Sequence, residues 1–288
     1  MDSTLLTQTF ETLNATLTRA NLLLPSTAQD VDWSAHAYLW QVLHGRGFLR
    51  GLPSPRLQNL DELLSIDRQK DAVLQNTRQF IHHFPANHVL LTGARGTGKS
   101  SLVRACLAQY AAQGLRVIEV EKEHLHDLPQ IVDLIRDRPE RFIVFCDDLS
   151  FEAQDTGYKS LKTVLDGSFN GYAENVLVYA TSNRRHLLPD FYADDSEVHP
   201  SETVEEKTAL SERFGLWLSF YVFSQDDYLN IVADALRRLG WIAADDVDAL
   251  AMRTAALQFA QQRGSRSARV AQHFARDWAG RVFLAGLA

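Results

Sequence analysis

The sequence is poor in cysteine, has no excess of basic residues and contains no long hydrophobic run. Its only cysteines among 288 residues are Cys106 and Cys146, both within apolar runs, which excludes a disulfide scaffold or a cysteine-rich metal site and indicates buried, reduced thiols. Lysine and arginine total 29 against 36 aspartates and glutamates, so the formal net charge is −7. This balance argues against a globally basic nucleic-acid-binding surface.

Signals for membrane insertion or secretion are also missing. No apolar stretch reaches the roughly 18 residues that a membrane-spanning helix needs. The first residues, MDSTLLTQTFETLNATLTRA, have no basic leader before an apolar core, unlike a secretory signal peptide. We therefore expect a cytoplasmic protein that does not associate with a membrane.

Short apolar runs alternate with helical patterns in the middle of the chain. The runs are rich in β-branched and aromatic residues, and in order they read HVLLTG, RVIEVE, RFIVFCDD, NVLVYATSN and LWLSFYVF. Helical patterns such as SSLVRACLAQYAAQ and LPQIVDLIRDR separate the first three runs. Strands that alternate with helices predict an α/β fold with a parallel sheet covered on both faces.

The regions before and after this core have a helical character. Residues 1–44 lack glycine and place leucines and a phenylalanine at helical spacing, and LDELLSIDRQKDAVLQNTRQFI predicts a further helix that leads to the first strand. Three helical patterns follow Ser224 with no strand between them. We therefore expect an N-terminal helical segment at 1–58, an α/β core at 59–223 and a helical lid at 224–288.

The strongest chemical signal is GARGTGKS, which matches the phosphate-binding pattern G-x-x-x-x-G-K-[ST] and lies between a predicted strand and a predicted helix. In such a loop, backbone N–H groups surround phosphates, the lysine reaches the β and γ phosphates, and the last hydroxyl ligates Mg²⁺. We expect ATP with Mg²⁺ to bind at Gly93, Ala94, Arg95, Gly96, Thr97, Gly98, Lys99, Ser100 and Ser101, with Ser100 as a metal ligand.

Polar side chains end two other predicted strands. RFIVFCDD ends in Asp147 and Asp148, and we assign Asp147 to Mg²⁺ through water and Asp148 to the water that attacks the γ-phosphate. VLVYATSN ends in Asn183, whose amide could hydrogen-bond the γ-phosphate or that water. Each group has a plain structural alternative, because carboxylates and amides also cap helices and favour turns.

These motifs, in this order, resemble those of the AAA+ ATPases, a class of P-loop NTPases. The resemblance implies that Arg213, in LSERFGL, is a finger that reaches the γ-phosphate in a neighbouring subunit. It also implies a second sensor arginine in the lid, where GSRSAR offers Arg266 as the favoured residue and Arg269 as the other candidate. Each arginine, taken alone, is also compatible with an ordinary surface charge.

The chain resembles more closely one bacterial family of predicted AAA+ proteins described as a domain of unknown function. The segments LDELLSIDRQKDAVLQNTRQF, GARGTGKSSLVRA, FCDDLSFE, YATSNRRHLLP and SERFGLWLSFYVFSQDDYL support this resemblance over about residues 60–275. In AAA+ proteins generally, a glutamate usually stands at the position of Asp148, and a glycine often stands at that of Ser65. The shorter carboxylate predicts slow turnover, and adenine contacts are expected near Ile66.

We expect an AAA+ ATPase that hydrolyses ATP as a remodelling or loading machine, in a homo-oligomer such as a hexameric ring. The alternative is a nucleotide-gated switch with little hydrolysis of its own, which recruits a protein partner or DNA, although the net charge does not favour DNA. A small-molecule kinase is disfavoured because no acceptor-site signature is present and Asn183 and Arg213 would be unexplained. The acidic residues 190–212 are either a solvated loop or an element that binds a partner or a neighbouring subunit.

Overall fold

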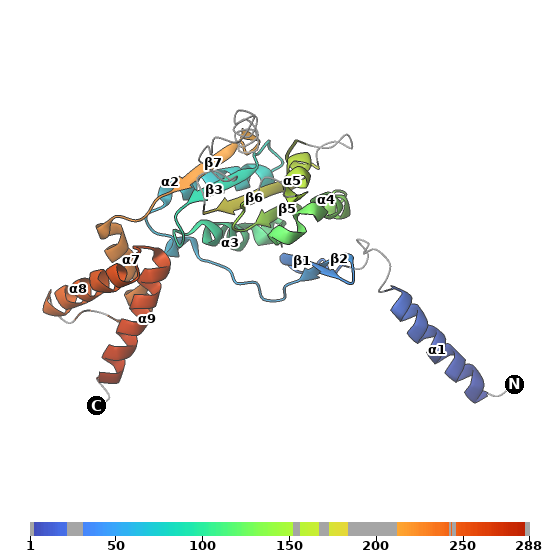
Figure 1. The fold of residues 1–288 in the computed structure, drawn as a ribbon, viewed down its shortest axis with the longest axis horizontal. Helices are drawn as coiled ribbons and strands as arrows, with labels where there is room; N and C mark the ends of the chain where they lie inside the picture. The colour runs from blue at the N-terminus through green and yellow to red at the C-terminus, as the bar shows by residue number, and fades with distance from the viewer. Residues whose placement is uncertain are drawn as a thin grey trace, which may run out of the picture.

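A seven-stranded sheet lies at the centre of the molecule (Figure 1). The computed structural model describes residues 3–21, 31–151, 156–166, 173–183, 212–241, 243 and 246–285. The strand order is β2-β1-β4-β5-β6-β3-β7, and all neighbours are parallel except β1 and β2. Their bounds are β1 Ala37–Leu43, β2 Arg46–Gly51, β3 Val89–Gly93, β4 Leu115–Glu119, β5 Arg141–Cys146, β6 Val176–Ser182 and β7 Leu216–Phe220. The five strands predicted from the sequence are β3 to β7, so the α/β class is confirmed.

Helices cover both faces of this sheet. Side chains alternate along each strand, so that Val89 and Leu91 of β3 join one core cluster while Leu90 joins the other. The first cluster lies under α2 (Asp67–Ile81) and α3 (Lys99–Tyr110), the second under the 3₁₀ helix η4 (Lys122–Asp127), α4 (Leu128–Ile135) and α5 (Thr156–Asp166). Short 3₁₀ turns lie at η2 (Leu60–Glu62) and η3 (Ala111–Gln113). Each cluster also contains one of the cysteines, both of which are free and buried as predicted.

Three helices after the sheet form the predicted lid (Figure 1). They are α7 (Gln225–Arg238), α8 (Asp246–Gln262) and α9 (Ala268–Ala285). Ser224 caps α7, since its Oγ accepts the N–H of Asp227 at 3.1 Å. Apolar residues of all three helices are buried together with the α2–α3 side of the core. This shared apolar cluster joins the lid to the core.

The N-terminal prediction is wrong for residues 37–51, which form the hairpin β1–β2 and not a helix. Its turn is His44-Gly45, with φ of +52° and +75°, as a two-residue turn between twisted strands requires. The strand β1 alternates between buried residues such as Tyr38 and Trp40 and more exposed ones, and it pairs with β4. The sheet therefore begins before residue 59, and only α1 (Ser3–Asn21), which projects from the rest (Figure 1), is the helix expected here.

The helix expected at 60–81 begins only at Asp67. Ser65 has φ of +59°, in the left-handed region that interrupts a helix, and Ile66 is the N-cap residue of α2. The interruption separates η2 from α2 and leaves Ile66 at the edge of the lid, where it contributes to the site described below.

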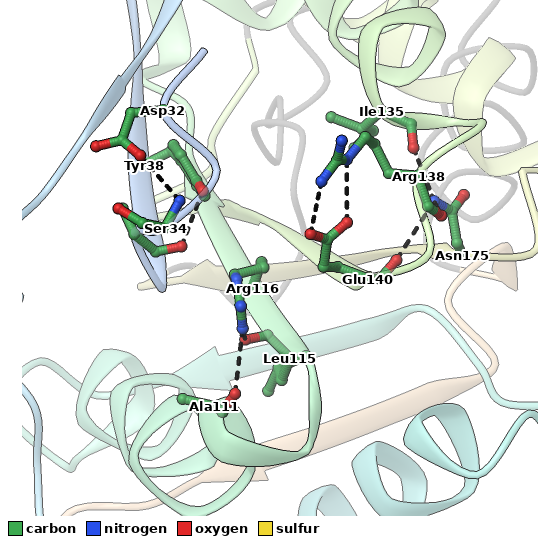
Figure 2. Close-up of polar contacts among 11 residues, drawn as sticks. Asp32, Ser34, Tyr38, Ala111, Leu115, Arg116, Ile135, Arg138, Glu140 and Asn175 are labelled. Atoms are coloured by element: carbon green, nitrogen blue, oxygen red, sulfur yellow. Dashed lines mark hydrogen bonds and ion pairs between the residues drawn. The ribbon is translucent and has the colours of Figure 1, made fainter. Parts of the chain in front are cut away.

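Polar contacts stabilise the edge of the sheet where the parallel strands begin (Figure 2). Asn175, just before β6, donates to the carbonyls of Ile135 at 2.7 Å and Arg138 at 3.1 Å. Arg138 makes two hydrogen bonds to Glu140, just before β5. These side chains hold the connections at the amino ends of the strands. The candidate functional groups lie at the opposite, carboxyl ends. In the part of the chain that the structure describes, no helix is long and apolar enough to cross a membrane.

Candidate nucleotide-binding site

A cavity of about 660 Å³ lies between the core and the lid. The carboxyl ends of β3, β5 and β6 meet at one wall, because Thr92 of β3 pairs with Ser182 of β6, and Cys146 of β5 pairs with Ala180. The opposite wall is formed by α9, and the segment 56–66 closes one side. Ligand sites at the carboxyl ends of parallel strands are the rule in open α/β sheets.

The phosphate-binding loop connects β3 to α3 and is fixed by its glycines. Gly93 has φ of +125°, and a Cβ atom there would lie 1.9 Å from the carbonyl oxygen of Phe220 on β7, so only glycine fits. The residues Arg95 to Ser101 line the cavity, and α3 starts at Lys99 with its N-terminus at the loop. Free N–H groups and the positive end of the helix dipole make this an anion-binding position.

Lys99 is held at the centre of the site. Its Nζ donates to the carbonyls of Gly93 at 2.7 Å and Ala94 at 2.8 Å, and to Oδ1 of Asn183 at 3.0 Å. Neither Gly93 nor Ala94 lines the cavity itself; their carbonyls orient the lysine. Burial lowers the pKa of Lys99, whereas the carboxylates of Asp147 and Asp148 act in the opposite direction.

Ser100 and Asp147 form the candidate metal site. Ser100 Oγ donates to Asp147 Oδ1 at 2.6 Å, and Thr181 Oγ1 donates to the same oxygen at 2.5 Å. Hydroxyl and carboxylate oxygens are the ligands that Mg²⁺ prefers, and Mg²⁺ is often bound by one or two protein oxygens together with phosphates and water. The hydroxyl of Ser100 and the carboxylate of Asp147 fit such a shared site. Among the described residues, no group of three or more His, Cys, Asp or Glu side chains could hold a metal ion.

Asp148, the candidate for orienting water, lies beside Asn183 and Arg95. Its Oδ1 accepts from Asn183 Nδ2 at 2.6 Å, and its Oδ2 lies 4.0 Å from Nη2 of Arg95. Its φ of +52° is unusual for an aspartate, and its backbone N–H donates to Thr181 Oγ1 at 2.9 Å. The structure thus brings together Lys99, Asp148 and Asn183, which are up to 84 residues apart in sequence.

One part of the cavity lining is apolar. Ile66, Leu63 and Leu64 line it from the segment before α2, and Phe223 and Ile231 line it from the start of the lid. A Cβ on Gly98 would meet Ile66 Cδ1 at 3.4 Å, so this apolar side directly adjoins the phosphate-binding loop. An apolar wall beside a phosphate site suits a flat base, and Ile66 lies where the adenine contact was expected.

The three predicted arginines lie in different places. Both arginines are exposed, but Arg269 lines the cavity from the first turn of α9 and Arg266 does not. Arg213 is also outside the cavity of its own chain, and its Nε donates to Asp166 at the end of α5. Of the acidic residues 190–212, Glu212 alone is among the described residues, so the predictions for this segment lie outside the part of the chain that the structure describes.

Several polar lining residues were not predicted from the sequence, among them Arg56, Arg104, Thr181 and Arg276. Arg104 follows Ser100 by four positions on α3, and Arg276 follows Arg269 by seven on α9, so helical periodicity could have identified both. Thr181 lies within β6, whose seven residues are all buried, so the alternation of a strand does not distinguish it. Arg56 lies in a segment without regular periodicity that could have indicated its role.

Solved structures similar to this one have low sequence identity to it. The Thermotoga maritima RuvB Holliday junction branch migration motor is 17% identical, with a TM-score of 0.44 over 76% of this chain and 71% of that chain. C. elegans PCH-2 is 18% identical, with a TM-score of 0.41 over 63% of this chain and 50% of that chain. No curated protein matches the chain in sequence.

The AAA+ type of P-loop fold is instead evident from the chain itself. The strand β6, which Asn183 follows, lies between the P-loop strand β3 and the strand β5, which Asp147 follows, and a helical lid comes after β7. A family model described as "Protein of unknown function (DUF815)" matches residues 33–282. This match spans most of the chain, which therefore belongs to the DUF815 family.

Proposed function

We propose that the protein is a Mg²⁺-dependent ATPase that hydrolyses ATP within a homo-oligomer and remodels or loads a protein partner. The observation that supports this most directly is a set of contacts at the carboxyl ends of the parallel strands. Lys99 bonds Asn183, Asn183 bonds Asp148, and Ser100 bonds Asp147 beside them. A plain glycine-rich turn would not require these polar side chains to converge.

The residues divide into binding and reacting groups. The N–H groups of the loop and Lys99 would hold the β and γ phosphates, and the apolar side at Ile66 would receive the adenine. Ser100 and Asp147 would hold Mg²⁺, which supplies neutralisation of the phosphate charge when bound. Asp148 would orient the attacking water, and Asn183 would hold Asp148 in place.

Arginines would stabilise the charge that develops in the transition state. Arg269 lines the cavity from the lid, which supports giving it this role in preference to Arg266. Arg213 does not line its own cavity, which supports a role in the cavity of a neighbouring subunit. On this proposal, a single chain has an incomplete site and hydrolysis requires assembly.

A second candidate function is a nucleotide-gated switch with little hydrolysis. The observation that favours it is the state of Asp148, which is one methylene shorter than glutamate and already accepts from Asn183. A misplaced carboxylate orients water poorly, so ATP would be held longer than it is cleaved. The bound nucleotide would then control the affinity for a partner.

Phosphate release measured against protein concentration tests the proposal. We expect the rate per chain to rise with concentration in the wild type, to be lost in Lys99→Ala and to fall at least tenfold in Arg213→Ala, because a finger contributes about 10³–10⁵ in related enzymes. Lys159→Ala and Arg253→Ala, exposed residues outside the cavity, serve as matched controls. Phosphate release at background levels at every concentration, with ATP still bound, would contradict hydrolysis and favour the switch.

A further inference from the structure

Thr181 lies between the two carboxylates of the site although it is inside a buried strand. It is 2% exposed, and its neighbour Ala180 pairs with Cys146 of β5, so Thr181 lies beside Asp147. Its hydroxyl donates to Asp147 Oδ1 at 2.5 Å and accepts the backbone N–H of Asp148 at 2.9 Å. A single hydroxyl therefore contacts both consecutive carboxylate residues.

We propose that Thr181 is a positioning residue that fixes the Asp147 carboxylate for Mg²⁺ and the Asp148 backbone for the orientation of water. This inference rests on the proposed function, since it concerns the same site. Thr181, on β6, would act indirectly, by positioning Asp147 and Asp148.

The first effect concerns rotation of the Asp147 carboxylate. The terminal torsion of an aspartate is broad, so a carboxylate with a single hydrogen bond can turn. Here Oδ1 accepts two hydroxyl protons, one from Ser100 at 2.6 Å and one from Thr181 at 2.5 Å. Both hold the same oxygen, which fixes the plane of the carboxylate and leaves Oδ2 for the metal or its water. When Ser100 also serves as a metal ligand, the Thr181 hydroxyl still holds Asp147 Oδ1.

The second effect concerns the backbone of Asp148. Its φ of +52° lies in the left-handed region, which is unfavourable for a residue with a Cβ and persists only where surrounding contacts require it. Thr181 provides these contacts twice, since its Oγ1 accepts the N–H of Asp148 and its carbonyl accepts the N–H of Leu149 at 2.6 Å. The turn places the Asp148 carboxylate against Asn183, so loss of the hydroxyl would release the side chain that orients water.

The test compares Thr181→Val, which keeps the shape and removes the hydroxyl, with Thr181→Ser, which keeps the hydroxyl. The readout is the Mg²⁺ concentration that half-saturates the binding of a fluorescent ATP analogue, alongside kcat. For Thr181→Val we expect this concentration to rise at least fivefold and kcat to fall at least tenfold, with the affinity for the Mg²⁺-free analogue within twofold of wild type. Thr181→Ser should restore both values to within threefold.

Thr77→Val is the matched control, because Thr77 is a fully buried threonine of the core whose hydroxyl contacts Tyr179 and not the site. It should lower stability without changing the Mg²⁺ dependence. An unchanged Mg²⁺ dependence in Thr181→Val would overturn the inference and reduce Thr181 to a core residue. If Thr181→Val does not fold, Thr181→Cys replaces it, and an unchanged Mg²⁺ dependence there would likewise overturn the inference.

The binding readout separates this inference from the proposed function. A wild type that binds the analogue with Mg²⁺ but releases no phosphate refutes hydrolysis, while the half-saturating Mg²⁺ concentrations still decide the role of Thr181. A wild type that hydrolyses ATP with equal Mg²⁺ dependence in Thr181→Val supports the function and refutes the inference.

Discussion

The backbone N–H of Ala268, the first residue of α9, donates to the carbonyl of Gly96 in the phosphate-binding loop at 2.9 Å. The lid is thus joined to the loop by a main-chain hydrogen bond, and Arg269 follows immediately. A movement of the loop on phosphate binding and a movement of the lid would therefore be coupled through this hydrogen bond. Such a link is a physical route by which the nucleotide could change the position of the lid.

The close contact at Gly96 predicts a severe effect of Gly96→Ala. Gly96 has φ of +73°, and its Cβ would lie 2.9 Å from both Cβ and Oγ of Ser267. The variant combines backbone strain with a clash against the lid, so we expect at least a tenfold loss of affinity for a fluorescent ATP analogue, about 1.4 kcal/mol or more.

Gly114→Ala is the control for this change. Gly114 also has a positive φ, +95°, but a Cβ there would have no atom within 4 Å. We expect it to lower the free energy of unfolding by about 1 kcal/mol and to leave nucleotide affinity unchanged. Equal affinities of the two variants would show that the contact between loop and lid does not matter for binding.

The two lid arginines provide a second comparison. Both side chains are exposed, but Arg269 lines the cavity and Arg266 does not. Arg269→Ala should weaken ATP binding about tenfold, the range of a hydrogen bond to a charged group at a partly solvated site, and Arg266→Ala less than twofold. Titration calorimetry with ATP and Mg²⁺ measures both, and the reverse order would restore Arg266 as the sensor.

The sequence predicted those parts of the site that lie at the ends of regular elements. Asp147 and Asn183 were found because a polar residue after a buried apolar run is conspicuous, and Lys99 because its spacing from glycines is fixed by phosphate geometry. Thr181 was missed because a threonine within such a run is indistinguishable from core. Its importance depends on the register between β5 and β6, which is a non-local property.

The hairpin β1–β2 was missed for a similar reason. Residues 37–43 are too short to distinguish strand from helix by periodicity, and they follow a helical pattern without an intervening glycine. The strand is stabilised by pairing with β4 and by side-chain burial, both of which depend on residues distant in sequence. Apolar runs bounded by polar or turn residues sufficed for β3 to β7, and helical patterns separated the first three of them.

Replacement of Trp40 tests how strongly the hairpin β1–β2 stabilises the folded protein. Its side chain is 2% exposed, and its Nε1 donates to Asp127 Oδ2 at 2.9 Å, across the connection between η4 and α4. Trp40→Ala should lower the free energy of unfolding by about 3–5 kcal/mol, measured by urea denaturation. Val42→Ala, on the same strand but 37% exposed, should cost less than about 1 kcal/mol. Similar values for the two would indicate that the hairpin is not part of the cooperative core.

His88 gives the stability a defined dependence on pH. Burial lowers the pKa of His88 to about 4, and its Nδ1 accepts the backbone N–H of Val178 at 3.0 Å, which requires the unprotonated nitrogen. In the unfolded chain the imidazole has its ordinary pKa of about 6.5, so between these values the unfolded state binds more protons. Stability from this group is therefore fully present above pH 6.5 and is lost as the pH falls toward 4.

The expected loss at pH 5, relative to pH 7.5, is about 2 kcal/mol in the free energy of unfolding. Urea denaturation at both pH values measures it, in the wild type and in His88→Asn, whose side-chain oxygen can accept the same hydrogen bond but does not titrate. The variant should lose about 2 kcal/mol less than the wild type over this interval, because every other titrating group is shared. Parallel pH profiles for the two proteins would mean that His88 is solvated enough to titrate normally in the folded state, and the acid sensitivity would then have to arise from other groups.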